Sequence, residues 1–63
     1  MTGRELKAIR KRLTWTQERM AQGVGVAANT IARYERDELG IKESTARLIR
    51  LIAEQAKPAA RKR

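Results

Sequence analysis

Apolar residues recur along most of the chain at intervals of three and four, the spacing that places them on one face of an α-helix. The pattern predicts four helices, over residues 2–13, 17–23, 28–36 and 42–56. The β-branched residues are scattered and form no alternating apolar and polar run, so no strand is expected. These features predict an all-α, compact four-helix domain over residues 1–56.

The inner face of each predicted helix can be read from its apolar positions. The expected core residues are Leu6, Ile9 and Leu13 in the first helix, Met20, Ala21 and Val24 in the second, Ile31 and Tyr34 in the third, and Thr45, Leu48, Ile49 and Ile52 in the fourth. The core is small, because a chain of 63 residues is close to the lower limit for folding alone.

Capping residues mark the helix boundaries. Thr2 and Glu5 fit the capping box, in which the threonine accepts from the N–H of the glutamate and the glutamate side chain reaches back. Thr16 is a sound N-cap for the second helix. Gly23 is a poor helix former, so this helix should stop close to it, and Gly25 tolerates the left-handed backbone of a sharp turn.

The composition argues against catalysis. The chain has no Cys and no His, which removes disulfides, the commonest metal ligands and the usual nucleophile–base pairs. The single serine, Ser44, has no base beside it in the sequence. We therefore expect no enzyme activity, no catalytic residues, no metal site and no cofactor.

A formal net charge of +8 indicates an anionic partner, which could be nucleic acid, a membrane surface or an acidic protein. Pro58 should end the fourth helix, and residues 57–63 are expected to form a disordered basic tail. No apolar run approaches the roughly 20 residues of a membrane-spanning helix, and residues 1–12 are too charged for a signal peptide. We expect a cytoplasmic protein associated with a bacterial nucleoid.

Residues 17–36 combine a short helix, a glycine turn and a second short helix. The pattern consists of Thr16, Gln17 and Glu18 at the start, Ala21 where the helices cross, Gly25 in the turn, Val26, Ile31 and Tyr34 at apolar positions, and Glu35 at the end. It resembles the helix-turn-helix of the Cro and lambdoid-repressor family. The stretches Leu6–Leu13 and Ala46–Ile52 are similar to the family's first and last helices. The resemblance implies a lambda-repressor-like DNA-binding domain of four helices, with five helices as the alternative.

Three positions depart from the family pattern. Ala27 stands where the family usually has a Ser or Thr that caps the third helix, and losing that cap costs about 1 kcal/mol. Thr14 replaces a common glycine after the first helix, and Gly23 is unusual inside the second.

The resemblance implies that the third helix enters the major groove, where each base pair presents its own pattern of donors and acceptors. The residues expected to read bases are Ala28, Asn29, Thr30 and Arg33. Asn29 can pair with adenine and Arg33 with guanine, each through two hydrogen bonds, while Thr30 and Ala28 can touch a thymine methyl. The alternatives are a hydrogen bond from Asn29 to its own backbone and a phosphate contact for Arg33.

Phosphate contacts are expected around these residues. By the resemblance, Gln17 binds the DNA backbone at a helix N-terminus, where N–H groups attract anions. Arg36 and Lys42 flank the loop after the third helix, as phosphate clamps or as solvated surface charges. In the family, Arg10 and Glu35 form a structural ion pair between the first and third helices, and Arg10 could also reach a phosphate.

The expected function is a sequence-specific regulator of double-stranded DNA, a repressor or autoregulator of phage or bacterial type. Such proteins bind palindromic operators as dimers, and Leu39 and Leu51 suggest a homodimer face near the fourth helix. The alternatives are an antitoxin-like module that binds DNA and a protein partner, and an amphipathic membrane-surface peptide. Trp15 could stack on single-stranded bases, but one Trp and one Tyr favour core packing instead.

Overall fold

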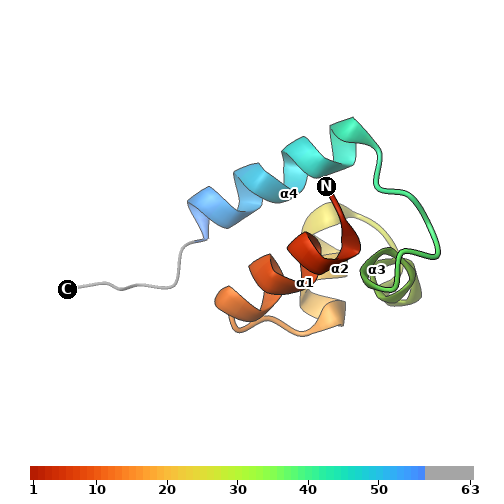
Figure 1. Ribbon diagram of the computed structural model, residues 1–63. Coiled ribbons are helices and arrows are strands. Elements are labelled where there is room, and N and C mark those ends of the chain that lie inside the picture. Colours follow the sequence, from red (N-terminus) through yellow and green to blue (C-terminus); the bar gives the residue numbers. More distant parts are fainter. Residues whose placement is uncertain (57–63) are drawn as a thin grey trace.

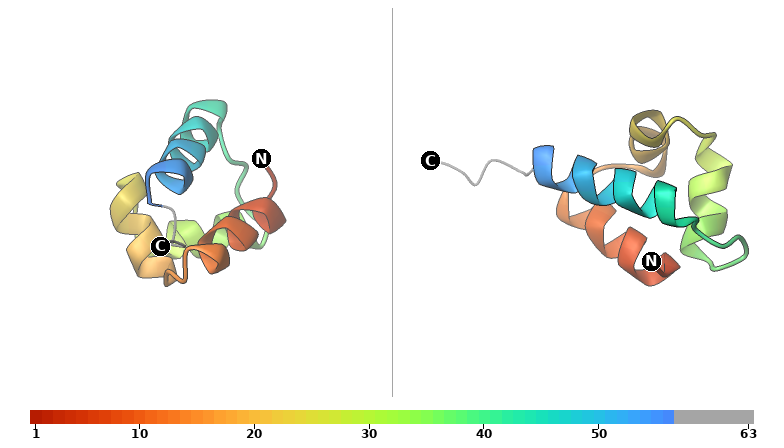
Figure 2. Two further views of the ribbon diagram at one scale, coloured as in Figure 1. Left: turned by 90° about the vertical axis from the view of Figure 1, so that its left-hand side faces the viewer. Right: turned by 90° about the horizontal axis from the view of Figure 1, so that it is seen from above.

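The structure is a computed structural model of the 63-residue chain and describes residues 1–56. Its helices are α1 (Gly3–Arg12), α2 (Gln17–Val24), α3 (Ala28–Glu35) and α4 (Glu43–Gln55). In Figures 1 and 2, α4 runs alongside α1 and α2, and α3 lies on the side of the molecule away from the C-terminal end of α4. The described residues contain no strand, so the predicted all-α four-helix fold is confirmed. The tail expected over residues 57–63 lies outside the described residues.

Each helix contributes one large, fully buried side chain to the core. These are Leu6 of α1, Met20 of α2, Ile31 of α3 and Ile49 of α4. Burying a side chain of this kind contributes about 1.5–3 kcal/mol, so the four together tie the helices into one unit. In the part of the chain that the structure describes, no helix is long and apolar enough to cross a membrane.

The buried face of α4 differs from the sequence prediction at one residue. Leu48, which was expected inside, is 38% exposed, whereas Ala46 and Ile49 are buried. Residues three apart share a helix face, so the inward face that contains Ala46 and Ile49 turns Leu48 toward solvent. Apolar residues occupy more than one stripe of α4, and only the packing against the other helices selects which stripe is buried.

The predicted caps are present at the starts of α1 and α2. The N–H of Glu5 donates to Thr2 Oγ1 at 3.1 Å, and the N–H of Thr2 donates to Glu5 Oε1 at 2.9 Å, which completes the capping box. The N–H of Arg19 donates to Thr16 Oγ1 at 3.0 Å. As expected, Ala27 forms no side-chain cap at the start of α3, so this helix begins without that stabilisation.

Thr14 is expected to be a site of backbone strain, because it has a φ of 60°. Its N–H donates to the Lys11 carbonyl at 2.9 Å and that of Trp15 donates to the Arg10 carbonyl at 3.1 Å, the pattern of a Schellman motif. A β-branched residue pays about 1–2 kcal/mol for this conformation. We expect Thr14→Gly to raise the free energy of unfolding by about 1 kcal/mol, after allowing for the greater entropy of glycine in the unfolded chain.

Urea unfolding followed by circular dichroism measures this effect. Asp37→Gly is the contrasting variant, because Asp37 has a similar φ of 59° but its carboxylate accepts the N–H of Gly3. Thr14→Gly should shift the midpoint upward and Asp37→Gly should not. An unchanged or lowered midpoint for Thr14→Gly would contradict the strain argument.

Candidate nucleic-acid interface

The tight turn at Gly25 determines how α3 leaves α2. Gly25 has a φ of 87° and a ψ of 32°, a left-handed conformation that glycine adopts at little cost. The N–H groups of Gly25 and Val26 both donate to the Ala21 carbonyl, at 2.8 and 3.0 Å. Helix α2 continues one residue beyond Gly23, because the left-handed residue that stops it is Gly25. Ala21 is only 3% exposed, and its small side chain lets the two helices pack closely.

The two sides of α3 have opposite character. Ile31 and Tyr34 are buried, whereas Asn29 and Arg33 are exposed and share one face because they are four residues apart. No hydrogen bond among residues 1–56 involves the Asn29 side chain, so it does not bond to its own backbone. The outward face therefore presents an amide and a guanidinium one helical turn apart.

The other two expected base-reading residues are less accessible. Ala28 and Thr30 are half-buried, and Ala28 packs against the hydrophobic core. The outward face of α3 is thus formed mainly by Asn29 and Arg33.

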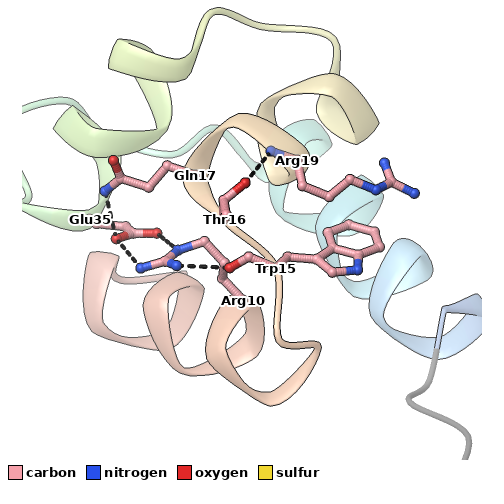
Figure 3. A network of polar contacts seen from close by, with 6 residues as sticks. All are labelled: Arg10, Trp15, Thr16, Gln17, Arg19 and Glu35. Carbon is pink, nitrogen blue, oxygen red and sulfur yellow. Dashed lines mark hydrogen bonds and ion pairs between the residues drawn. The ribbon is translucent and has the colours of Figure 1, made fainter.

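Arg10 and Glu35 join α1 to the last turn of α3 (Figure 3). Arg10 Nε lies 2.6 Å from Glu35 Oε2, and Arg10 Nη2 donates to Glu35 Oε1 at 3.2 Å. Arg10 Nη1 donates to the Trp15 carbonyl at 2.9 Å. The two side chains are 14% and 4% exposed, so this pair is nearly removed from solvent. The Arg10 guanidinium thereby links three parts of the chain, which are α1, the segment that precedes α2, and the end of α3.

The charge of Glu35 is maintained by its partners. Burial raises the pKa of Glu35, but hydrogen bonds from Arg10 and Gln17 and the charges of Arg10 and Lys7 outweigh it, so the pKa lies below its ordinary value. Glu35 is therefore an anion at neutral pH, and the ion pair with Arg10 is intact there.

Gln17 belongs to the same network. Its Nε2 donates to Glu35 Oε1 at 3.2 Å, and its side chain is half-buried (Figure 3). The structure thus brings together three of the expected residues, Arg10, Gln17 and Glu35. Of the two roles expected for Arg10, the ion pair is the one seen, and the phosphate contacts of Arg10 and Gln17 stay predictions.

Arg36 and Lys42 are both exposed, but their surroundings differ. Arg36 Nε donates to Glu38 Oε2 at 2.8 Å, and Lys42 occupies the N-cap position of α4 without a side-chain cap. Neither residue belongs to the Arg10 network. The Glu38 carboxylate is already bound to the Arg36 guanidinium, so a DNA phosphate would have to displace that carboxylate.

Gly3 and Asp37, which no sequence pattern singled out, join the start of α1 to the end of α3. The N–H of Gly3 donates to Asp37 Oδ1 at 2.9 Å. A Cβ on Gly3 would meet the Tyr34 carbonyl oxygen and lie 2.7 Å from that of Glu35. The available signal was a glycine in the first turn of a capped helix, where a better helix former would be expected.

Trp15 packs against the hydrophobic core and is half-buried, which agrees with core packing rather than with a stacking platform. The guanidinium carbon of Arg19 lies 4.3 Å from the centroid of the Trp15 ring, within the range of a cation–π contact (Figure 3). Arg19 is thereby held beside the indole.

Comparison with known proteins bears on the whole of this arrangement. A family model described as helix-turn-helix matches residues 6–55, which include all four helices apart from the first residues of α1. Comparison with curated proteins and with solved structures gave no match.

Proposed function

Because the chain belongs to the helix-turn-helix family of the Cro and lambdoid-repressor type, a family of DNA-binding regulators, we propose that it represses transcription from a specific operator. Helix α3 reads the major groove, and repression results from occupying the site that polymerase needs. The observation that carries the proposal is the exposed Asn29 and Arg33 face, on a helix whose direction is fixed at both ends. The Gly25 turn fixes its start, and the Arg10–Glu35 pair fixes its last turn.

The chemistry of this face suits base recognition. An amide can pair with adenine N6 and N7, and a guanidinium can pair with guanine O6 and N7. Asn29 and Arg33 present these groups one turn apart, so we assign base reading to them, with Thr30 and Ala28 as half-buried neighbours that touch thymine methyls. Arg36 and Lys42 contact phosphates on the flanks and set the register on the duplex.

We further propose that the protein binds its operator as a homodimer. The exposed large apolar residues among those described are Leu39, Leu48 and Leu51, at 38%, 38% and 50% exposed. Leu48 and Leu51 lie on α4, and Leu39 lies in the loop that leads into it. A two-fold pair of such domains presents two copies of α3 to half-sites about one helical turn of DNA apart.

Selection from random duplex DNA, followed by binding of the selected sequence at two salt concentrations, tests this function. We expect a palindromic sequence whose preference over random DNA survives the higher salt. Asn29→Ala and Arg33→Ala should each weaken binding to that sequence by roughly tenfold to a hundredfold, because each removes a two-bond base contact. Binding to random DNA should hardly change for Asn29→Ala, and for Arg33→Ala it should fall less than binding to the selected sequence.

Arg50→Ala is the matched control, because it also replaces an exposed arginine by alanine, but this arginine belongs to α4 and not to the outward face of α3. It should change both affinities only slightly. If no sequence is selected and binding falls steeply with salt for every duplex, the protein is a general basic binder and the proposed function is wrong. A selected sequence with a single half-site would contradict the dimer alone.

A further inference from the structure

Glu38 lies where the loop after α3 folds back along the helix. Its N–H donates to the Arg33 carbonyl at 2.9 Å. Its carboxylate accepts from Arg36 Nε at 2.8 Å and from Arg36 Nη2 at 3.3 Å, and it lies 3.9 Å from Arg33 Nε. One carboxylate is therefore shared by two arginines that the proposed function assigns to DNA.

The cluster is accessible and fully charged. The side chains of Arg33, Arg36 and Glu38 are 51%, 59% and 50% exposed, so a DNA phosphate can reach them. Hydrogen bonds from Arg36, and then the charges of Arg36 and Arg33, lower the pKa of Glu38, while Glu38 raises the pKa of Arg36. Glu38 is thus an anion at the pH of any DNA-binding experiment.

We infer that Glu38 is a specificity-determining residue, which competes with DNA phosphates for Arg36 and Arg33 and so weakens binding to random sequences more than to the operator. The inference rests on the proposed function. Binding to random DNA depends almost entirely on phosphate contacts and the release of condensed cations. When Arg36 moves from Glu38 to a phosphate, the abandoned carboxylate lies beside the DNA and recruits a cation, which offsets part of that release.

The operator complex is affected less, because its geometry differs. The guanidinium of Arg33 can pair with guanine through its two terminal nitrogens while Nε stays next to Glu38. Glu38 then keeps one of its partners and helps to hold Arg33 in place. The same carboxylate therefore opposes phosphate binding and is compatible with base reading.

The test compares Glu38→Gln with Glu54→Gln. Both variants make the same neutral replacement of an exposed glutamate, but Glu54 belongs to the last turn of α4. The C-terminal end of α4 lies remote from α3 (Figures 1 and 2). Affinities for the selected operator and for a random duplex are measured over a series of salt concentrations. Thermal unfolding shows that the variants are equally folded.

Glu38→Gln should raise the affinity for random DNA by about twofold to fivefold and steepen its salt dependence by about one released ion. The ratio of operator to random affinity should fall by a smaller factor, because Arg36 is also freed to bind a phosphate of the operator, and Glu54→Gln should leave both quantities close to wild type. Equal effects of the two variants would indicate a general response to net charge and overturn the inference, as would an unchanged Glu38→Gln. If the wild-type protein selects no DNA sequence, the proposed function and this inference both fail. If it selects an operator but Glu38→Gln behaves like wild type, only this inference fails.

Discussion

Replacing Arg10 with alanine is expected to lower the free energy of unfolding by about 3–5 kcal/mol. The Glu35 carboxylate is 4% exposed and would lose its two-bond partner, while the Trp15 carbonyl would lose its donor. A domain of this length has a total stability of roughly 3–9 kcal/mol, so Arg10→Ala should remove about half of it or more. Urea unfolding followed by circular dichroism measures the loss.

The double variant Arg10→Met with Glu35→Leu separates charge from packing. If the cost of Arg10→Ala comes from leaving a buried charge without its partner, replacing both residues by apolar side chains should restore stability to within about 1 kcal/mol of wild type. A double variant as unstable as Arg10→Ala would contradict this account. It would show instead that the geometry of the guanidinium, including its bond to the Trp15 carbonyl, is required.

The pH dependence of the free energy of unfolding provides a second test of the Arg10–Glu35 ion pair, by comparison of wild type with the double variant. The pKa of Glu35 is lowered in the folded state, so its stabilising contribution is fully present above the ordinary glutamate pKa of about 4.3. It is lost as the pH falls through the lower, folded-state pKa. Wild type should therefore lose stability more steeply than the double variant below about pH 4.

Features that depend on near neighbours in the sequence were predictable from it. The Thr2 and Glu5 capping box, the Thr16 cap and the left-handed Gly25 each involve residues within one helical turn, so their chemistry is visible in the order of the residues. The Arg10 and Glu35 pair is different, since its members are 25 residues apart. Only the resemblance to a known family predicted that pair.

Features that depend on the relative placement of helices were not predictable. Gly3 and Asp37 are 34 residues apart, and their contact exists only because the start of α1 meets the end of α3. The inward phase of α4, which exposes Leu48, is likewise decided by the neighbouring helices. Gln17 has the residue type of a phosphate ligand, but its bond to Glu35 follows from the approach of α2 to α3.

Gly3→Ala is expected to destabilise the protein by about 3 kcal/mol, although alanine is the better helix former by up to about 1 kcal/mol. The new Cβ would meet the Tyr34 carbonyl oxygen and lie 2.7 Å from the Glu35 carbonyl oxygen. Both are backbone atoms of α3 and cannot turn aside as a flexible side chain would. The start of α1 must therefore move, which also breaks the bond from the Gly3 N–H to Asp37.

Gly40→Ala is the matched control, because it makes the same chemical change where a Cβ would meet no atom within 4 Å. Its urea midpoint should stay close to wild type, while that of Gly3→Ala should fall. Equal midpoints for the two variants would contradict the close approach of α1 to α3. Because Glu35 lies at the end of α3 that Gly3 touches, the displacement should also disturb the Arg10 pair, so Gly3→Ala should cost less in the Arg10→Met and Glu35→Leu background than in wild type.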